Sequence, residues 1–552
     1  MSGPLLIGPL LRYVDEVSTV IWVEVAAPAT VTVHAGDTTY SARSFTVHGH
    51  HYALVDVEGL SPGASLPYSV DVGDVRVWPA LDGSPDSRVR TLDPAHGLDL
   101  AYGSCRTSAP HDADGTKAYG VDALRAVALR MREQPDAEWP DLVMFLGDQV
   151  YADETSPRMK DFIASRRDIG EPPGEELKDY EEYAHVYALC WNDPAIRWLL
   201  SALPSTMIFD DHDIRDDWNT SSTWRQQMAA TSWWHDRIVG GLASYWVYQH
   251  LGNLSPAERA ADTWWQQVQA LGPDADAGQL LDDLAERADE HPDSYRWSYS
   301  RDVGRTRIVV VDSRSARVLT PDRRSMLDDD EMSWFDDRLT GDVDHLLIGT
   351  SLPYLLPPGL HHLEAWDEAV AEGAWGEVGK AVGERIRQGL DLEHWAAFQQ
   401  GFRQVAGALR AVVTGQRGPA PETVVFLSGD VHHSYLAEVD LGPWQGRGRL
   451  LQAVCSPIRN PMPVPVRWGM SLAARSGAWR VGRWLARSAK VDDPPMRWRL
   501  VEGPWFENNL ASIEIDGRSM RLHWETAVDD GDTDANGDVV PRIHTVRDVR
   551  VP

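Results

Sequence analysis

Side chains that bind metals follow several apolar runs in the second part of the chain. The run at 142–146 is followed at once by Asp148, Tyr151 and Asp153. The other polar run ends lie at 103–106, 210–213, 312–314, 350–351 and 429–433. In open α/β sheets, ligands bind just beyond the carboxyl ends of the strands. A single Gly-Asp pair after a strand is usually a capped turn, but the repetition of polar ends favours one shared site.

The residue types at these ends predict a metal centre. Carboxylate, imidazole, thiol and phenol groups are all metal ligands, and thiolate with phenolate favours a trivalent or redox-type metal such as Fe(III). Several carboxylates in one site would repel each other unless cations lay between them. Asp148 is therefore a candidate bridge between two metals, and two close cations could hold a phosphate and activate a water.

The elements that must position these residues fall into two predicted regions. Residues 1–95 contain short β-rich runs separated by Pro and Gly turns, which predicts a small all-β sandwich domain. Residues 96–552 alternate apolar strands with amphipathic helices, which predicts an α/β layered domain. Two helical insertions are expected, a Trp-rich one at 175–290 and a second at 360–412. Tryptophan at helical spacing is usually core, although the first insertion could also form a pocket wall.

Composition narrows the possible partners. The chain has 552 residues and a formal net charge of −31, which argues against general nucleic-acid binding and against an anionic membrane partner. No apolar run is long enough to span a bilayer. The three cysteines are far apart and the N-terminus lacks a basic signal region, so no disulfide framework and a cytoplasmic location are expected.

The ordered motifs identify a family resemblance. "GSC", "FLGDQVYAD", "FDDHD", "VVVDSRSAR" and "FLSGDVHHS" resemble the PhoD-like alkaline phosphatases of the calcineurin-like metallophosphoesterase superfamily. The resemblance covers most of the chain and includes the N-terminal β-sandwich. It implies a four-layer α-β-β-α sandwich, hydrolysis of phosphate mono- or diesters, and a site holding ferric iron with calcium.

The resemblance also implies roles for individual residues. His212 is expected to give a proton or hydrogen bond to the leaving oxygen. Arg314 and Arg106 could grip a phosphate, or each could pair with a local acid. Asp216 or Asp217 could add a calcium ligand. The expected metal ligands are Cys105, Asp148, Tyr151, Asp211, Asp430 and His432.

Three further histidines, His433, His361 and His362, are expected to lie away from the metals. His433 should point elsewhere than His432 if strand geometry continues, and His361-His362 are expected at the surface. The wider superfamily has a histidine after its fifth strand, where this chain has Thr350-Ser351. That difference fits a mixed iron and calcium site better than two transition metals.

Three functional readings follow. The first is a metal-dependent phosphohydrolase, with a small monoester or diester as substrate because the acidic surface would slow highly charged ones. The second is a non-catalytic binding protein in which metals only stabilise the fold. The third is a generic esterase, which no Gly-x-Ser-x-Gly motif at a strand end supports.

Overall fold

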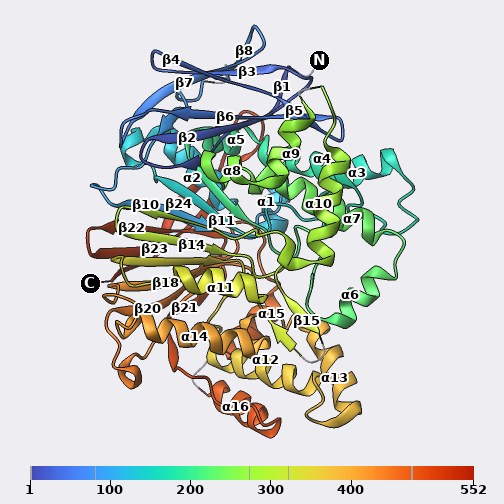
Figure 1. The fold of residues 1–552 in the computed structure, drawn as a ribbon, viewed down its shortest axis with the longest axis vertical. Helices are drawn as coiled ribbons and strands as arrows, with labels where there is room; N and C mark the ends of the chain where they lie inside the picture. Colours follow the sequence, from blue (N-terminus) through green and yellow to red (C-terminus); the bar gives the residue numbers. More distant parts are fainter. Residues whose placement is uncertain (1–2, 81–82, 273, 321–322, 474–476, 552) are drawn as a thin grey trace.

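The computed structural model describes residues 3–80, 83–272, 274–320, 323–473 and 477–551. An all-β sandwich lies at one end of the long axis and a group of helices at the other, with two β-sheets between them (Figure 1).

The N-terminal sandwich is made of two antiparallel sheets. Their strand orders are β1-β2-β6-β5 and β4-β3-β7-β8, with β9 paired to β7. The bounds are β1 Leu5–Val14, β2 Ser18–Val25, β3 Thr30–Ala35, β4 Thr38–Arg43, β5 Phe45–Val47, β6 His50–Glu58, β7 Ser65–Val72, β8 Val75–Trp78 and β9 Arg88–Arg90. Strand β2 is buried on both faces, because Ile21 and Val23 face the sandwich core while Val20 and Trp22 face the helices beneath.

Two central sheets carry the rest of the fold. The first has the order β12-β11-β10-β22-β23-β24 and the second β13-β14-β17-β18-β20-β19-β21. The bounds in the first sheet are β10 Leu98–Gly103, β11 Leu142–Leu146, β12 Ser205–Ile208, β22 Asn509–Asp516, β23 Ser519–Thr533 and β24 Val539–Val551. Those in the second are β13 Tyr299–Val303, β14 Thr306–Val311, β17 His345–Thr350, β18 Thr423–Ser428, β19 Ser434–Val439, β20 Arg449–Val454 and β21 Trp498–Trp505.

Successive side chains of a strand point to opposite faces of its sheet, and this places the sheets between layers of helices. On β14, Ile308 and Val310 belong to the core shared with the first sheet, whereas Val309 and Val311 pack with the helices on the other side. Those helices include α11 (Asp329–Arg338) and α14 (Gln399–Val413). Strands buried on both faces explain why the sequence shows continuous apolar runs. The result confirms the predicted α/β fold, four layers with a preceding all-β sandwich.

Helices cover the first sheet and join it to the sandwich. The bounds are α1 Ala113–Tyr119, α2 Ala123–Glu133, α3 Pro157–Arg166, α4 Tyr180–Trp191, α5 Pro194–Ala202, α6 Ser222–Ala229, α7 Trp234–Tyr245, α8 Pro256–Ala261, α9 Thr263–Leu271 and α10 Gly278–Glu290. Within the predicted Trp-rich insertion at 175–290, seven tryptophans are buried, and Trp264 and Trp265 are partly buried. They are core residues, as helical spacing predicts.

A group of four helices, here called the helical cap, lies on the side of the central sheets opposite the sandwich, with α16 at the tip of the molecule and α15 nearer the sheets (Figure 1). It consists of α12 (Pro358–Ala371), α13 (Gly376–Gly389), α15 (Val464–Ala473) and α16 (Ala478–Ser488). The expectation that His361 and His362 lie at the surface is wrong, because α12 buries both, and the His361 ring lies 4.6 Å from that of Phe402. Within the described ranges, every helix is too short or too polar to cross a lipid bilayer.

Candidate metal centre

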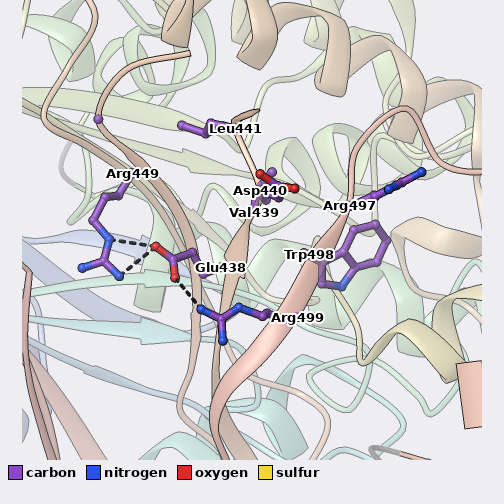
Figure 2. Close-up of a pocket in the computed structure, with 9 residues that line it drawn as sticks. Glu438, Val439, Asp440, Leu441, Arg449, Arg497, Trp498 and Arg499 are labelled. Atoms are coloured by element: carbon purple, nitrogen blue, oxygen red, sulfur yellow. Dashed lines mark hydrogen bonds and ion pairs between the residues drawn. The ribbon is translucent and has the colours of Figure 1, made fainter. Parts of the chain in front are cut away.

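A surface cavity of about 510 Å³ lies away from the predicted residues. It is lined in part by Arg449, Arg497, Trp498 and Arg499 around Glu438 (Figure 2). Glu438 lies 2.8 Å from Arg449 and 3.7 Å from Arg499, so its charge offsets theirs. The cavity is at the far end of β19 from the Gly-Asp-Val-His-His loop, and it holds none of the predicted ligands.

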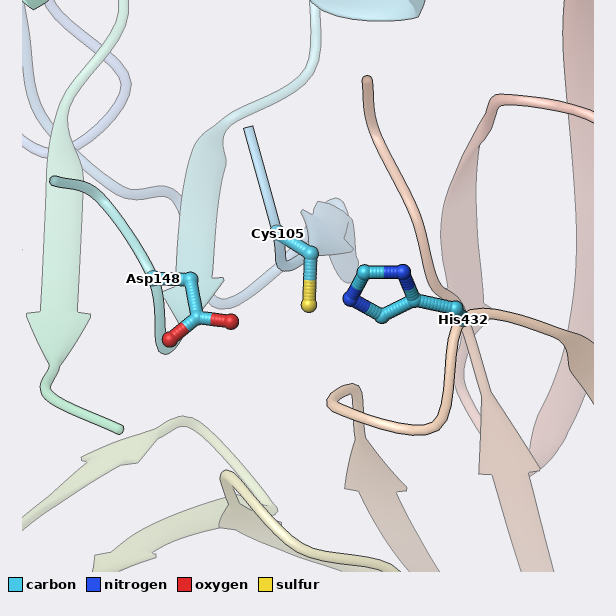
Figure 3. A group of neighbouring side chains, drawn as sticks. All are labelled: Cys105, Asp148 and His432. Atoms are coloured by element: carbon cyan, nitrogen blue, oxygen red, sulfur yellow. The ribbon is translucent and has the colours of Figure 1, made fainter. Parts of the chain in front are cut away.

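The strand ends of the two central sheets instead bring Cys105, Asp148 and His432 together (Figure 3). One potential ligand atom from each lies within 4.8 Å of the others. Cys105 and Asp148 follow the parallel neighbours β10 and β11, while His432 comes from the second sheet after β18. The predicted meeting of carboxyl strand ends therefore occurs, and it joins the two sheets.

The backbone at these three residues adopts the left-handed conformation. The φ angle is 59° at Cys105, 51° at Asp148 and 49° at His432, and it is also positive at Asp430. Non-glycine residues rarely adopt such angles, and they concentrate at functional sites where the surroundings enforce them. Glycine is needed beside them: a Cβ on Gly147 would lie 2.5 Å from the Cβ of Asp210.

Three buried carboxylates form the adjoining part of the site. Asp148, Asp210 and Asp211 each place an oxygen within 4.8 Å of the others. Asp148 Oδ1 and Asp210 Oδ2 are buried and have no hydrogen-bond partner, whereas Asp211 Oδ1 lies 3.1 Å from Arg314 Nη2. Buried carboxylate oxygens without donors are costly unless a cation compensates them, so this donor set fits metal binding.

The local electrostatics support the same interpretation. Burial raises the pKa of Asp148 and of Asp210 well above the ordinary value, and neighbouring carboxylates raise them further. Burial also lowers the pKa of His432 to about 4, which keeps its ring neutral at pH 7 and able to ligate a metal. The pKa of the Cys105 thiol is raised by burial and by Asp148, so a cation is needed for a thiolate there.

The remaining predicted ligands lie beside this cluster. The Tyr151 hydroxyl is 3.5 Å from Asp148 Oδ2. The backbone oxygen of Asp430 is 3.7 Å from Cys105 Sγ, and its carboxylate accepts a hydrogen bond of 2.8 Å from His394. As expected, His433 points elsewhere: its ring is buried and its Nδ1 lies 2.6 Å from the Val431 carbonyl.

His212 stands at the edge of the cluster with an acidic partner. Its Nδ1 lies 2.8 Å from Asp153 Oδ1, and its side chain is 16% exposed. The other oxygen of Asp153 accepts the Asp216 N–H at 2.6 Å. Burial alone would lower the pKa of His212, but Asp153 and Asp211 outweigh it and raise that pKa well above the ordinary value. The contact directs Nε2 away from Asp153, and Nε2 lies 3.9 Å from Asp216 Oδ1. Asp211, His212 and Asp216 also place potential ligand atoms within 4.8 Å of one another, so the geometry allows His212 a proton transfer or a place in the metal shell.

A second acidic group lies next to the first. Asp216, Asp217 and Asp391 place oxygens within 4.8 Å of one another. Asp217 is buried, has a φ of 64°, and its Oδ1 has no hydrogen-bond partner. Its backbone N–H donates to Asp211 Oδ2 at 3.1 Å, so the two acidic groups are directly linked.

The two arginines predicted to bind phosphate have other partners. Arg314 is fully buried at the centre; its guanidinium pairs closely with Asp210 and Glu393 and lies 3.1 Å from Asp211. It therefore neutralises carboxylates, and its donors are not free. The guanidinium of Arg106 is buried against Asp122 at 2.8 Å and the Cys190 carbonyl at 3.0 Å. Arg106 therefore pairs with a local acid, which was the alternative left open by the sequence. The prediction that Arg106 binds phosphate is wrong.

Sequence reasoning missed several residues at the site. Asp213 accepts the backbone N–H groups of Asp148 (2.9 Å), Asp210 (2.8 Å) and Val150 (3.4 Å), and so ties the ends of β11 and β12 together. Asp213 could have been found from the sequence, because it belongs to the "DDHD" motif that follows an apolar run. His394 had none, because it comes from the second helical insertion, far from any strand end.

Two sheets with helices on their outer faces and a metal-ligand cluster at the strand ends define a metallophosphoesterase-like class of protein. Residues 123–464 match the model of the PhoD-like phosphatases, and the chain belongs to that family. This confirms the resemblance seen in the motifs and indicates phosphoester hydrolysis in general. Residues 2–90 match the model of a domain of unknown function, DUF7800.

One solved structure shares the fold, and a second is more distantly similar. The structure described as "Structure of PhoD" has a TM-score of 0.60 at 13% identity, and the match covers 100% of this chain and 90% of that one. The purple acid phosphatase PPD1 from yellow lupin (Lupinus luteus) seeds matches with a TM-score of 0.46 at 10% identity, covering 94% and 71% of the two chains. Comparison with curated protein sequences finds no match.

Proposed function

We propose that this protein hydrolyses small phosphate monoesters or diesters with a metal-activated water at the strand-end cluster. The observation that carries the proposal is the set of three adjacent buried carboxylates, two of which have an oxygen without a partner, beside the partly exposed His212–Asp153 pair. The overall charge of −31 favours a small substrate over a polyanion.

The donor types suggest which cations each part would hold. Cys105, Tyr151, His432 and Asp148 offer thiolate, phenolate, imidazole and carboxylate, which suit Fe(III). Asp211, Asp216, Asp217 and Asp391 offer oxygen only, which suits Ca²⁺. Asp148 is within reach of both Cys105 and Asp211, so it is our candidate for the bridging ligand.

Bound cations would offset the charge of the phosphoryl group and lower the pKa of an attacking water. The protein's own contribution is proton transfer and orientation. Asp153 accepts the Nδ1 proton of His212, which leaves Nε2 to give its proton to the leaving oxygen. Arg314 balances the excess negative charge of Asp210 and Asp430 from beneath the cluster.

The alternative is a binding protein with metals that only stabilise the fold. A closed structural site needs no proton donor at its edge. The His212–Asp153 pair lies at the edge of the cluster and is partly exposed, which favours catalysis. Free Cys105, Cys190 and Cys455 are compatible with the cytoplasm, which we propose as its compartment.

Elemental analysis of the purified protein with phosphatase assays tests the proposal. We expect iron and calcium, a visible tyrosinate band that Tyr151→Phe removes, and chelator-sensitive hydrolysis of p-nitrophenyl phosphate or bis-p-nitrophenyl phosphate. p-Nitrophenyl acetate should not be turned over. A protein that stays inactive on both phosphate esters after iron and calcium are restored would leave the binding protein as the better reading.

A further inference from the structure

The helical cap carries a strongly basic segment on an acidic protein. Between Pro461 and Lys490 there are five arginines, one lysine and no Asp or Glu, although the whole chain has a net charge of −31. The segment forms α15 and α16, and α16 lies at the tip of the molecule opposite the N-terminal sandwich (Figure 1). Its charge therefore projects away from most of the chain.

Large apolar side chains are exposed on the same two helices. Trp468 is 73% exposed, Trp484 68%, and Val464 and Val481 62% each. Most of the exposed large apolar side chains among the described residues lie in the cap or its connecting loops, at one end of the molecule. Isolated exposed apolar residues need no explanation, but such a concentration marks an interaction surface.

The outward face of α16 is separate from the face that holds it in the fold. Ala486 and Ala489 pack against Trp366 and Val370 of α12, whereas Val481 and Trp484 are exposed. Their positions are one turn apart, so they share one stripe of the helix. The inward stripe packs against α12, and the outward stripe is exposed to solvent.

Cations flank the outward stripe. Arg480 and Arg487 are exposed before and after it, and Lys490 is exposed just beyond the helix. Arg483 and Arg487 share Asp493, which lies 2.9 Å from Arg487. Arg480 and Lys490 have no carboxylate partner within the part of the chain that the structure describes. Arg480 lies over the Trp479 ring at 5.8 Å, so Arg480 and Lys490 are the cations of this face that an anionic partner could pair with, next to the exposed apolar stripe.

We propose that the outward face of α16, here called the basic patch (Arg480, Val481, Trp484, Arg487 and Lys490), binds the surface of an anionic lipid bilayer. Tryptophan favours the boundary between headgroups and acyl chains, and each Arg or Lys near an anionic surface adds about 1 kcal/mol of attraction. A helical face that projects from the protein can contact a flat surface. The helix would lie on the membrane surface, with its apolar stripe towards the acyl chains.

The net charge of −31 argues against an anionic membrane partner for the protein surface as a whole, and the basic patch is proposed as a local exception. Charges more than about 8 Å apart are largely screened at physiological ionic strength. The patch touches the headgroups, while the acidic bulk of the protein lies behind it. The proposal is independent of the catalytic proposal, because it concerns binding alone.

Vesicle co-sedimentation of the full chain tests it. We expect binding to vesicles of equal parts phosphatidylcholine and phosphatidylglycerol, little binding to phosphatidylcholine alone, and release by high salt. Arg480→Glu with Arg487→Glu should lower the partition coefficient about thirtyfold or more. Val481→Ser with Trp484→Ser should also weaken it. Val17→Ser with Val75→Ser, at exposed positions in the sandwich, is the matched control and should bind normally.

Two results would overturn the proposal. One is failure of the unmodified protein to bind the anionic vesicles. The other is retained binding by both double variants, with circular dichroism showing that they are folded. Light scattering tests whether a second copy of the chain covers the patch instead. If the protein is a dimer that the same variants dissociate, and it does not bind vesicles, the patch is a dimer interface and the membrane proposal is wrong.

Discussion

The two sides of the candidate site are built differently. Cys105 and Asp148 follow strands paired in register, with Leu100 opposite Leu142 and Gly103 opposite Phe145. Glu393 and His394 come instead from the segment between α13 and the short helix at Trp395–Ala397. They reach the site only through side chains, His394 between Glu364 (2.7 Å) and Asp430 (2.8 Å). A backbone ladder fixes the strand side, whereas the inserted side depends on a few polar contacts that can be removed one at a time.

The largest expected effect is on the strand side. Asp148→Asn keeps the size of the side chain but removes the charge shared by both proposed metals. We expect activity to fall below detection and bound metal to drop, measured by assay and elemental analysis. Asp141→Asn, at the start of the same strand and 3.3 Å from Arg90, is the control and should keep both. Full activity in the first variant would refute the bridging role.

His212→Gln tests the proton donor at the edge of the site. Loss of a general acid typically costs about 10²–10⁴ in turnover, and we expect kcat to fall in that range with metal content unchanged. A substrate with a good leaving group, such as p-nitrophenyl phosphate, should be affected less than an alkyl phosphate. Loss of metal in this variant would identify His212 as a ligand and contradict the assignment.

His394→Gln tests the inserted side. Groups that orient metal ligands typically contribute about 10–100-fold to affinity or activity, so a smaller loss than at Asp148 is expected. Glutamine can still donate to Asp430, and His394→Ala should therefore be worse. Metal affinity measured by chelator competition separates the two variants. An effect as large as that of Asp148→Asn would mean that both sides are equally essential, and the comparison would fail.

The smallest effect is expected outside both sides, where the sandwich meets α4. Burial lowers the pKa of His50, but Glu24 and Glu181 outweigh it and raise that pKa to about 9. The folded state holds its proton more tightly than an unfolded chain with a pKa near 6.5, so this stabilisation is complete below about pH 6.5 and lost as pH rises through about 9. The thermal midpoint should fall between pH 7 and 9.5 in the unmodified protein. It should fall less in His50→Gln; equal slopes would remove His50 from the explanation.

The same contrast explains what the sequence could reveal. Apolar runs ending in polar residues located Cys105, Asp148, Asp211, Asp430 and His432, because parallel strands must bring their carboxyl ends to one edge. No such rule places the 360–412 insertion, so His394 and Glu393 could not be found. Arg106 illustrates a different limit: alternate residues after a strand point to opposite sides, and its neighbour Cys105 already faces the cluster.

The left-handed backbone at Cys105 and His432 has a consequence for the stability of the fold. That conformation is unfavourable for residues with a Cβ, less so for histidine than for cysteine. Glycine would remove the strain at either position, but it would also remove the thiol or the imidazole. We therefore expect Cys105→Gly to unfold at a higher temperature than the unmodified protein when both are metal-free, and to lose that advantage once metal is added.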